Sequence, residues 1–251
     1  MQREIEKVAK LVARAQMVVV LTGAGVSRES GIPTFREAQT GVWANYDPER
    51  LATPEGFLAD PPLVWRWYDS RRAILADVKP NPGHYAIAEM EKIVAKVLVV
   101  TQNIDGLHAK AGSTDVIELH GNITEFHCFD AGHAADDVPF GLEAPPLCHC
   151  GSMLRPAVVW FGEALPTAAI HRSTREAQKA DVVFVVGTSG LVYPAASIPY
   201  IAKDAGAALI EVNPEDTPHT DIADVFLRGP SGEILPRIIE ACKSLHSDPS
   251  A

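Results

Sequence analysis

The sequence predicts an α/β protein with a Rossmann-like, doubly wound parallel sheet and a smaller inserted lobe. Three observations support this fold class: apolar runs of strand length recur along the chain, their apolarity is nearly continuous, and stretches with helical spacing separate them. Continuous apolarity is typical of strands covered on both faces, as in a parallel sheet flanked by helices. A chain of 251 residues can bury one substantial core, so we expect a single domain.

The predicted elements follow one another in the order that such a sheet requires. A helix is predicted over residues 2–15 from the spacing of Ile5, Val8, Leu11 and Val12, and an apolar strand over residues 17–21 follows it. We also predict strands over residues 97–101, 116–119, 182–186, 208–212 and 225–227, and helices over residues 85–95, 167–180, 194–205 and 234–245.

Two segments interrupt this alternation. Residues 37–82 are rich in aromatic residues, arginine and proline, and residues 122–156 carry three of the four cysteines between polar stretches. We assign both to a small lobe, made of a helical module and a possible zinc ribbon. The large Rossmann-like lobe then comprises residues 1–36, 83–121 and 157–251.

Composition and charge exclude several classes of partner. The formal net charge of −10 offers no general attraction to nucleic acid or to an anionic membrane. The longest apolar runs, over residues 17–21 and 182–186, are too short to span a bilayer, and the charged N-terminus does not resemble a secretory signal. We therefore expect a cytoplasmic protein, in which closely spaced cysteines favour a metal site over a disulfide.

A glycine-rich loop over residues 22–36 follows the first predicted strand. In a doubly wound sheet this position binds a dinucleotide, because glycines let the backbone approach a pyrophosphate. The usual G-x-G-x-x-G pattern is broken, since Arg28 stands where the third glycine would be. Gly23 and Gly25 alone therefore leave a simple tight turn as an equal alternative.

The whole loop is more specific than its glycines. Gly-Ala-Gly-Val-Ser, Glu-Ser-Gly-Ile-Pro and Thr-Phe-Arg, in this order between residues 23 and 36, resemble the signature of the sirtuins, the NAD-dependent protein lysine deacylases. Further blocks resemble sirtuin blocks in the family's order, and they lie at residues 101–108, 118–121, 155–163, 187–189 and 212–215. The resemblance extends from about residue 5 to residue 245.

The resemblance implies a reaction that consumes NAD. The acyl-lysine carbonyl oxygen attacks the nicotinamide ribose, nicotinamide leaves, and the acyl group ends on ADP-ribose, so the products are nicotinamide, O-acyl-ADP-ribose and free lysine. No hydride is transferred. The implied partners are acylated, lysine-containing proteins or peptides.

The resemblance also implies roles for individual residues. His120 would be the general base, and Asn103 would orient the ribose or a water; a buried structural histidine and turn capping by Asn103 or Asp105 are the alternatives. NAD contacts are expected from Gly23, Ala24, Gly25, Ser27, Phe35, Arg36, Gln102, Asn103, Ile104, Asp105, Gly187, Thr188, Ser189, Asn213, Pro214, Glu215 and Ser231.

Two further sets would bind the acylated peptide. Val159, Phe161 and Gly162 resemble the segment that pairs with the backbone of an extended peptide, although a plain buried strand is an alternative. Tyr68 and Arg71 resemble the pair of the sirtuin class that removes succinyl, malonyl and glutaryl groups, with weaker deacetylation. They are three residues apart and would share a helix face, where phenol and guanidinium together could hold a carboxylate. In the alternative interpretation Arg71 pairs with a nearby surface acid, and the role of Arg72 stays open.

The cysteines predict an incomplete metal site. Sirtuins usually bind a structural zinc through two pairs of cysteines, but here Cys128, Cys148 and Cys150 make only three, because Ala131 stands in place of the fourth. Either His127, Asp130, His133 or His149 replaces it, or the site binds no zinc. We expect Cys242 to be an apolar core residue.

Two other functions are compatible with NAD binding. A protein mono-ADP-ribosyltransferase would use the same chemistry but pass ADP-ribose to a protein acceptor. A catalytically silent NAD-binding module would lack the base or the pair Asn103 and Asp105. The presence of His120 and of both these residues favours deacylation.

Overall fold

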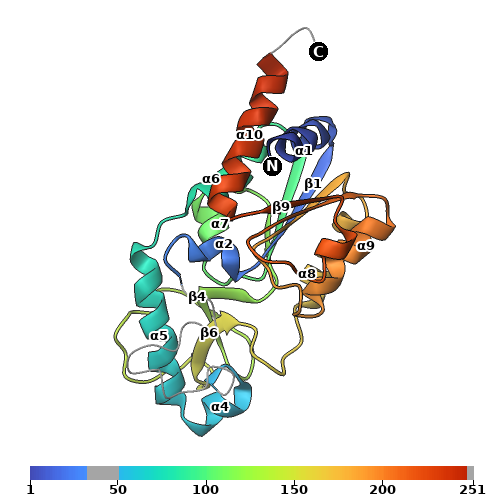
Figure 1. The fold of residues 1–251 in the computed structure, drawn as a ribbon. Helices are drawn as coiled ribbons and strands as arrows, with labels where there is room; N and C mark the ends of the chain where they lie inside the picture. Colours follow the sequence, from blue (N-terminus) through green and yellow to red (C-terminus); the bar gives the residue numbers. More distant parts are fainter. Residues whose placement is uncertain (33–50, 248–251) are drawn as a thin grey trace.

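The computed structural model describes residues 1–32 and 51–247 and contains a six-stranded parallel sheet (Figure 1). Its strand order, β3-β2-β1-β7-β8-β9, runs outward in both directions from the neighbours β1 and β7. This confirms the predicted doubly wound α/β fold. The strands are β1 (Met17–Thr22), β2 (Lys96–Thr101), β3 (Val116–Glu118), β7 (Val182–Val186), β8 (Ala208–Asn213) and β9 (Val225–Arg228).

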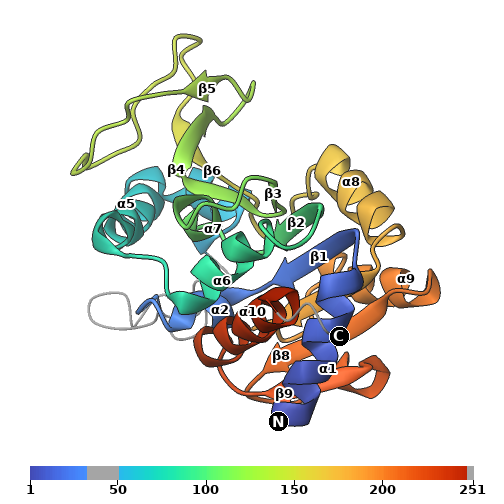
Figure 2. The same ribbon diagram turned by 90° about the horizontal axis from the view of Figure 1, so that it is seen from above.

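Helices cover both faces of the sheet (Figure 2). On one face α1 (Gln2–Arg14), α6 (Pro82–Met90) and α10 (Ser231–Ser247) share a core with the strands. On the other face α8 (Thr167–Ala177) and α9 (Ile198–Asp204) share a second core. Because β1, β2 and β7 are buried on both faces, their residues form the nearly continuous apolar runs seen in the sequence.

The helices differ from the prediction mainly at their ends. Helix α6 begins at Pro82 rather than at residue 85, because the Asn81 side chain accepts from the N–H groups of Gly83 and His84 and Pro82 suits the first helical position. It ends at Met90, five residues before the predicted end at residue 95. In the described part of the chain, no helix is both long and apolar enough to cross a bilayer.

A second group of elements forms around a three-stranded antiparallel sheet with the order β5-β4-β6. The strands are β4 (Gly121–Cys128), β5 (Ala134–Ala135) and β6 (Leu154–Val158), and the helices α4 (Pro54–Ala59) and α5 (Pro61–Asp77) pack on them through a cluster that includes Phe57 and Trp160. Strand β4 begins three residues after β3 ends. The two sheets therefore meet at His120.

Candidate active site

The predicted site residues follow strands whose carboxyl ends meet at one edge of the parallel sheet. The glycine loop leaves β1, and the loop that begins at Gly187 leaves β7, so the two loops lie at the point where the strand order reverses. They are bonded directly, since the N–H of Gly25 donates to the Gly187 carbonyl at 2.8 Å and the N–H of Gly23 to the Val186 carbonyl at 3.1 Å. Two short helices follow these strands: α2 (Ala24–Arg28) comes after β1, and α7 (Leu107–Lys110) comes after β2.

Three glycines allow this close approach. A Cβ atom on Gly25 would lie 2.7 Å from the Gly187 oxygen, and one on Gly23 would lie 2.8 Å from Cβ of Thr188. Gly187 itself has φ +57°, and a Cβ there would lie 2.5 Å from the Val26 nitrogen. The sequence predicts that these glycines serve the approach of a pyrophosphate; the structure adds that the two loops could not pack against each other with larger residues.

Asn103 is the centre of a buried hydrogen-bond network. Its Nδ2 donates to the Gly23 carbonyl and to Ser27 Oγ, both at 3.0 Å. Ser27 Oγ donates in turn to Asp105 Oδ2 at 2.6 Å, while Asp105 Oδ1 accepts from the N–H of Leu107 at 2.9 Å. Asp105 therefore caps a turn through one oxygen and joins the site through the other. Burial raises the pKa of Asp105, against the effect of these hydrogen bonds.

Side-chain bonds also tie together the ends of β2, β7 and β8. Gln102 Nε2 donates to Thr188 Oγ1 at 3.0 Å, and Asn213 Nδ2 donates to the Thr188 carbonyl at 2.9 Å. Ser189, Pro214 and Glu215 lie exposed beside these residues in the chain. The bonded side chains Gln102, Thr188 and Asn213 thus belong to one network, and Ser189, Pro214 and Glu215 are exposed next to it in the chain.

His120 presents an unprotonated nitrogen at the same edge. Its Nδ1 lies 2.9 Å from the Gln102 carbonyl, which can only accept, so Nδ1 carries the proton and Nε2 is the acceptor. Burial lowers the pKa of His120, although the bond to Gln102 acts in the opposite direction. The imidazole is therefore neutral at neutral pH and able to take up a proton.

A second titratable group, Glu118, lies two residues before this histidine. Its Oε1 accepts from Asn122 Nδ2 at 2.9 Å. Burial, followed by the negative charge of Glu125, raises the pKa of Glu118 to about 7. The site thus holds a carboxyl group and an imidazole that both titrate near or below neutrality.

The segment after β6 is held by a bidentate ion pair. Arg155 donates to both carboxylate oxygens of Glu163, at 2.5 and 2.9 Å, and its guanidinium lies 3.3 Å from the ring centroid of Trp160. Glu163 also accepts from the N–H of Trp160 at 2.7 Å. These bonds close the turn over residues 160–163, in which the N–H of Glu163 also donates to the Trp160 carbonyl at 3.0 Å.

The predicted peptide-binding residues lie on this turn. Phe161 is 50% exposed although it is aromatic, and Gly162 has φ +86°, a conformation that favours glycine. The N–H of Val159 donates to the His120 carbonyl at 2.9 Å. The segment therefore starts beside the candidate base, buries Trp160 and exposes Phe161.

Tyr68 and Arg71 lie near each other on α5. The Tyr68 side chain is buried, and its Oη accepts from Trp160 Nε1 at 2.8 Å. The Arg71 guanidinium lies 4.8 Å from the ring centroid of Trp67, and its positive charge influences Tyr68. Burial raises the pKa of Tyr68 and lowers that of Arg71.

Arg72 has a structural role that the sequence leaves open. It donates to Asp69 Oδ1 at 2.8 Å and to the Val138 carbonyl at 3.0 Å, and Asp69 also accepts from the N–H of Gly141 at 2.8 Å. Asp69, three residues earlier on the same helix, thus pairs with Arg72. Arg72 ties α5 to the cysteine-bearing segment.

The cysteines gather with one histidine. The ligand atoms of Cys128, His133, Cys148 and Cys150 all lie within 4.8 Å of one another. Cys128 Sγ lies 3.8 Å from Cys150 Sγ, and Cys148 Sγ lies 3.6 Å from His133 Nδ1. Tetrahedral zinc with its usual bond lengths places two sulfur ligands about 3.8 Å apart and a sulfur and a nitrogen about 3.6 Å apart. The donor set and spacing fit a structural zinc.

The structure thus selects His133 from the candidate replacements for the missing cysteine. His149 stacks on His133, with ring centroids 4.6 Å apart, while His127 lies on β4 near Arg155 and Asp130 is exposed. Sequence spacing could not identify the fourth ligand, because only the folding of the segment between Cys128 and Cys148 brings His133 next to the cysteines. Cys242 is buried in the core, as predicted.

Two of the predicted NAD residues lie outside the described residues, and a third is hydrogen-bonded at the start of a helix. Phe35 and Arg36 belong to residues 33–50, which are outside them. Ser231 begins α10, and its Oγ donates to a carboxylate oxygen of Glu29 at 2.7 Å, so its hydroxyl serves the start of that helix. Sequence reasoning missed Glu29 and Thr101; a polar residue directly after or at the end of a buried strand is the signal that could have indicated Thr101.

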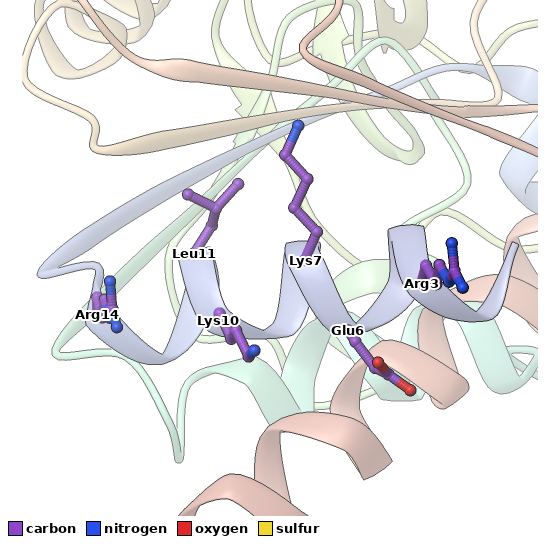
Figure 3. A pocket seen from close by; sticks show the side chains of 6 residues that line it. All are labelled: Arg3, Glu6, Lys7, Lys10, Leu11 and Arg14. Atoms are coloured by element: carbon purple, nitrogen blue, oxygen red, sulfur yellow. The ribbon is translucent and has the colours of Figure 1, made fainter. Parts of the chain in front are cut away.

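The charged hollow in Figure 3 is a different feature. It lies along α1 and is lined by Arg3, Glu6, Lys7, Lys10, Leu11 and Arg14. The labelled basic side chains extend outward from the helix. None of the predicted site residues lines it, so it is an open surface and not the candidate active site.

Comparison with known proteins decides the family. The family model described as Sir2 family matches residues 23–194, more than half of the chain. The chain belongs to the Sir2 family. The NAD-dependent protein deacylase 2 of Pyrobaculum aerophilum is 53% identical to it over 238 residues, which cover 94% of this chain and 95% of that protein. The resemblance to sirtuins is confirmed.

Solved structures agree with this assignment. A Sir2 homolog in complex with NAD has 45% sequence identity and a TM-score of 0.90, covering 96% of this chain and 95% of that chain. A mutant Sir2 homologue in complex with 2'-O-acetyl ADP ribose has 44% identity and a TM-score of 0.87, over 98% and 99% of the two chains. Sir2Af2 bound to a myristoylated histone peptide has 37% identity and a TM-score of 0.77, over 98% and 99%. This Sir2 enzyme is an NAD-dependent protein deacylase, and NAD is its co-substrate.

The metal cluster leads to a first prediction. We expect about one zinc per chain, and His133→Ala should weaken zinc binding by roughly 100-fold or more, because loss of a residue that only supports a metal ligand already costs roughly 10- to 100-fold. Metal analysis and competition with a chromophoric chelator would measure both. His149→Ala, which removes the stacked neighbour, is the matched control and should retain zinc. Equal zinc loss in the two variants, or folded wild-type protein without zinc, would contradict the assignment.

Proposed function

We propose that this enzyme preferentially removes acidic acyl groups, such as succinyl and malonyl, from lysine side chains, with deacetylation as a weaker activity. The observation that carries the proposal is the placement of Arg71 beside Tyr68 on α5. Expected products are nicotinamide, O-acyl-ADP-ribose and free lysine. Acylated protein or peptide segments are the partners.

The site geometry supports a division of roles at the sheet edge. The loops after β1 and β7 receive the phosphates and ribose of NAD, and Asn213, Pro214 and Glu215 after β8 receive the adenosine. Asp105 Oδ2 accepts a hydrogen bond from Ser27, so this oxygen can accept a similar donor from the nicotinamide amide. Asn103, bonded to the glycine loop, orients the ribose against the acyl carbonyl.

His120 is proposed as the general base. With Nδ1 bonded to the Gln102 carbonyl, Nε2 is the acceptor for a ribose hydroxyl proton. The carbonyl holds the imidazole in one tautomer and one orientation. Because Val159 is bonded to the His120 carbonyl, a peptide paired with residues 159–162 would lie next to this base.

The acyl preference rests on electrostatics. Burial lowers the pKa of Arg71, which means that the folded environment disfavours its charge, and an anionic acyl end would offset that cost. Tyr68 Oη already accepts from Trp160, so its orientation is set and its own hydrogen can point to a carboxylate. Arg72 pairs with Asp69, so this carboxylate is already engaged by the neighbouring guanidinium. An acetyl group would bind without engaging Arg71.

The arrangement of the cysteines supports a cytoplasmic location. No disulfide joins the four cysteines, all of which lie in the described part of the chain, and three of them contribute to the metal cluster. Thiolate zinc sites persist where disulfides are kept reduced. We therefore keep a cytoplasmic location as part of the proposal.

Replacing Arg71 tests the acyl preference. Arg71→Met should lower kcat/KM for succinyl-lysine peptides by roughly 10- to 100-fold, the value of a charge-assisted contact of about 1.5–3 kcal/mol, and leave acetyl-lysine peptides within about twofold. Peptides with acetyl, succinyl, malonyl and glutaryl groups would be compared by mass spectrometry of O-acyl-ADP-ribose. Arg66→Met, on the exposed face of the same helix, is the control. Equal loss on acidic and acetyl substrates would refute the preference, and ADP-ribosylated protein without O-acyl-ADP-ribose would refute deacylation.

The pKa of His120 predicts the acid limb of the pH profile. A base must be neutral to act, and burial lowers this pKa below the ordinary value of 6.5, so activity should persist below pH 6.5 and fall only at more acidic pH. The dependence of kcat/KM on pH between 4.5 and 8 would measure it. Nicotinamide exchange, which precedes deprotonation of the ribose hydroxyl, serves as the internal control and should lack this limb. Because Glu118 also titrates near pH 7, a limb at or above pH 6.5 that remains in Glu118→Gln would exclude His120 in this state as the base.

A further inference from the structure

A buried chain of hydrogen bonds runs from α7 to the backbone of Asn103. His108 Nε2 lies 2.9 Å from Thr22 Oγ1, Thr22 Oγ1 donates to Thr101 Oγ1 at 2.8 Å, and Thr101 Oγ1 accepts from the N–H of Asn103 at 3.0 Å. Since the Thr22 hydroxyl proton goes to Thr101, His108 donates to Thr22 through Nε2–H. The bonds of these three side chains thus end at the backbone N–H of Asn103.

Every member of this chain is shielded from water. Thr22 is 0% exposed, Thr101 and His108 are each 2% exposed, and Asn103 is 8% exposed. Buried hydrogen bonds are strong and costly to leave unmade, so each partner strongly favours a single geometry. Burial, followed by the neighbouring His84, lowers the pKa of His108 to about 3, so its ring is a neutral donor at neutral pH.

The chain also closes a ring around the loop that carries Asn103. Thr22 and Thr101 are the last paired residues of β1 and β2, so the bond between their hydroxyl groups adds a side-chain hydrogen bond at the end of the backbone pairing. The chain then leaves β2, passes Asn103 and enters α7, from which His108 returns to Thr22. The loop is therefore fixed at its start and at its end against the same residue of β1.

We propose that Thr22, Thr101 and His108 are positioning residues, which hold Asn103 in the orientation required for catalysis. The inference rests on the catalytic role proposed for Asn103. It extends the functional set beyond residues that touch NAD or the acyl-lysine. None of the three is placed to contact the reacting atoms, since their hydrogen bonds are directed at one another and at the Asn103 backbone.

Isosteric substitution of Thr101 separates positioning from packing. Thr101→Val keeps the shape but removes the acceptor for Thr22 and Asn103, whereas Thr101→Ser keeps the hydroxyl. We expect Thr101→Val to lower kcat of deacylation by roughly 10- to 100-fold, the loss typical of a small misplacement of catalytic groups, with KM for NAD changed by less than about threefold. Thr101→Ser should stay within about threefold of the wild type.

A double-mutant cycle with Asn103→Ala tests the route of the effect. If Thr101 acts through Asn103, Thr101→Val should lower kcat no further in the Asn103→Ala background. The positioning role would be overturned if Thr101→Val lowered kcat in the Asn103→Ala background as much as it does in the wild-type background. Equal loss of kcat in Thr101→Val and Thr101→Ser would also overturn it. If Asn103→Ala alone kept wild-type kcat, the proposed role of Asn103 would fail instead, so the two failures are distinguishable.

Two further variants keep the test decisive if Thr101→Val does not fold, as judged by its melting temperature. His108→Gln retains a side-chain N–H donor, and His108→Leu removes it at similar volume. The inference predicts near wild-type kcat for His108→Gln and a loss of roughly tenfold or more for His108→Leu at unchanged KM for NAD. Equal kcat in two folded His108 variants would overturn it.

Discussion

The close contact between the loops after β1 and β7 is the constraint on which the site depends. Two parallel strands that diverge in their connections leave a crevice at their carboxyl ends, and here Gly23, Gly25 and Gly187 let the two backbones touch within it. A single methyl group at these positions would meet backbone atoms, so the loops would separate. Thr188 could then no longer reach Gln102, and the ends of neighbouring strands would lose their common frame.

From this frame the polar side chains are organised before any ligand arrives. Asn103, Ser27 and Asp105 bond to one another and to the Gly23 carbonyl, and the Gln102 carbonyl sets the tautomer of His120. Gly23, Ser27 and Asn103 are buried, so an unmet hydrogen bond among them would be costly and alternative rotamers are disfavoured. A site that is already ordered loses little free energy to reorganisation during the reaction, which is the physical basis of electrostatic preorganisation.

The sequence predicts the parallel strands and the sheet edge well, because burial on both faces leaves a direct record in β-branched runs such as residues 17–21 and 182–186. It predicts less where the outcome depends on tertiary contacts. The earlier start of α6 depends on capping by Asn81, which accepts from the N–H groups of Gly83 and His84. Apolar periodicity does not indicate this start, because the first residues of the helix are not apolar. His133 could not be chosen over its neighbours, because Cys148 is distant in sequence. Arg72 could not be distinguished from Arg71, because Asp69 is close in sequence to both and the bond of Arg72 to the Val138 carbonyl depends on the fold.

The bonds described above connect the metal cluster to α5, the helix that carries the proposed acyl-binding pair. Arg72 and Asp69 on α5 bond to the backbone of Val138 and Gly141, which belong to the ribbon between Cys128 and Cys148. Trp65 on the same helix packs with Cys128 in one apolar cluster. Between Cys128 and Cys148, a stretch that the structure describes throughout, the only regular element is the two-residue strand β5. This segment therefore has few backbone hydrogen bonds of its own, and a bound metal would determine its shape. Because Tyr68 and Arg71 lie on α5 next to these anchors, the same metal would help to set where this proposed acyl-binding pair points.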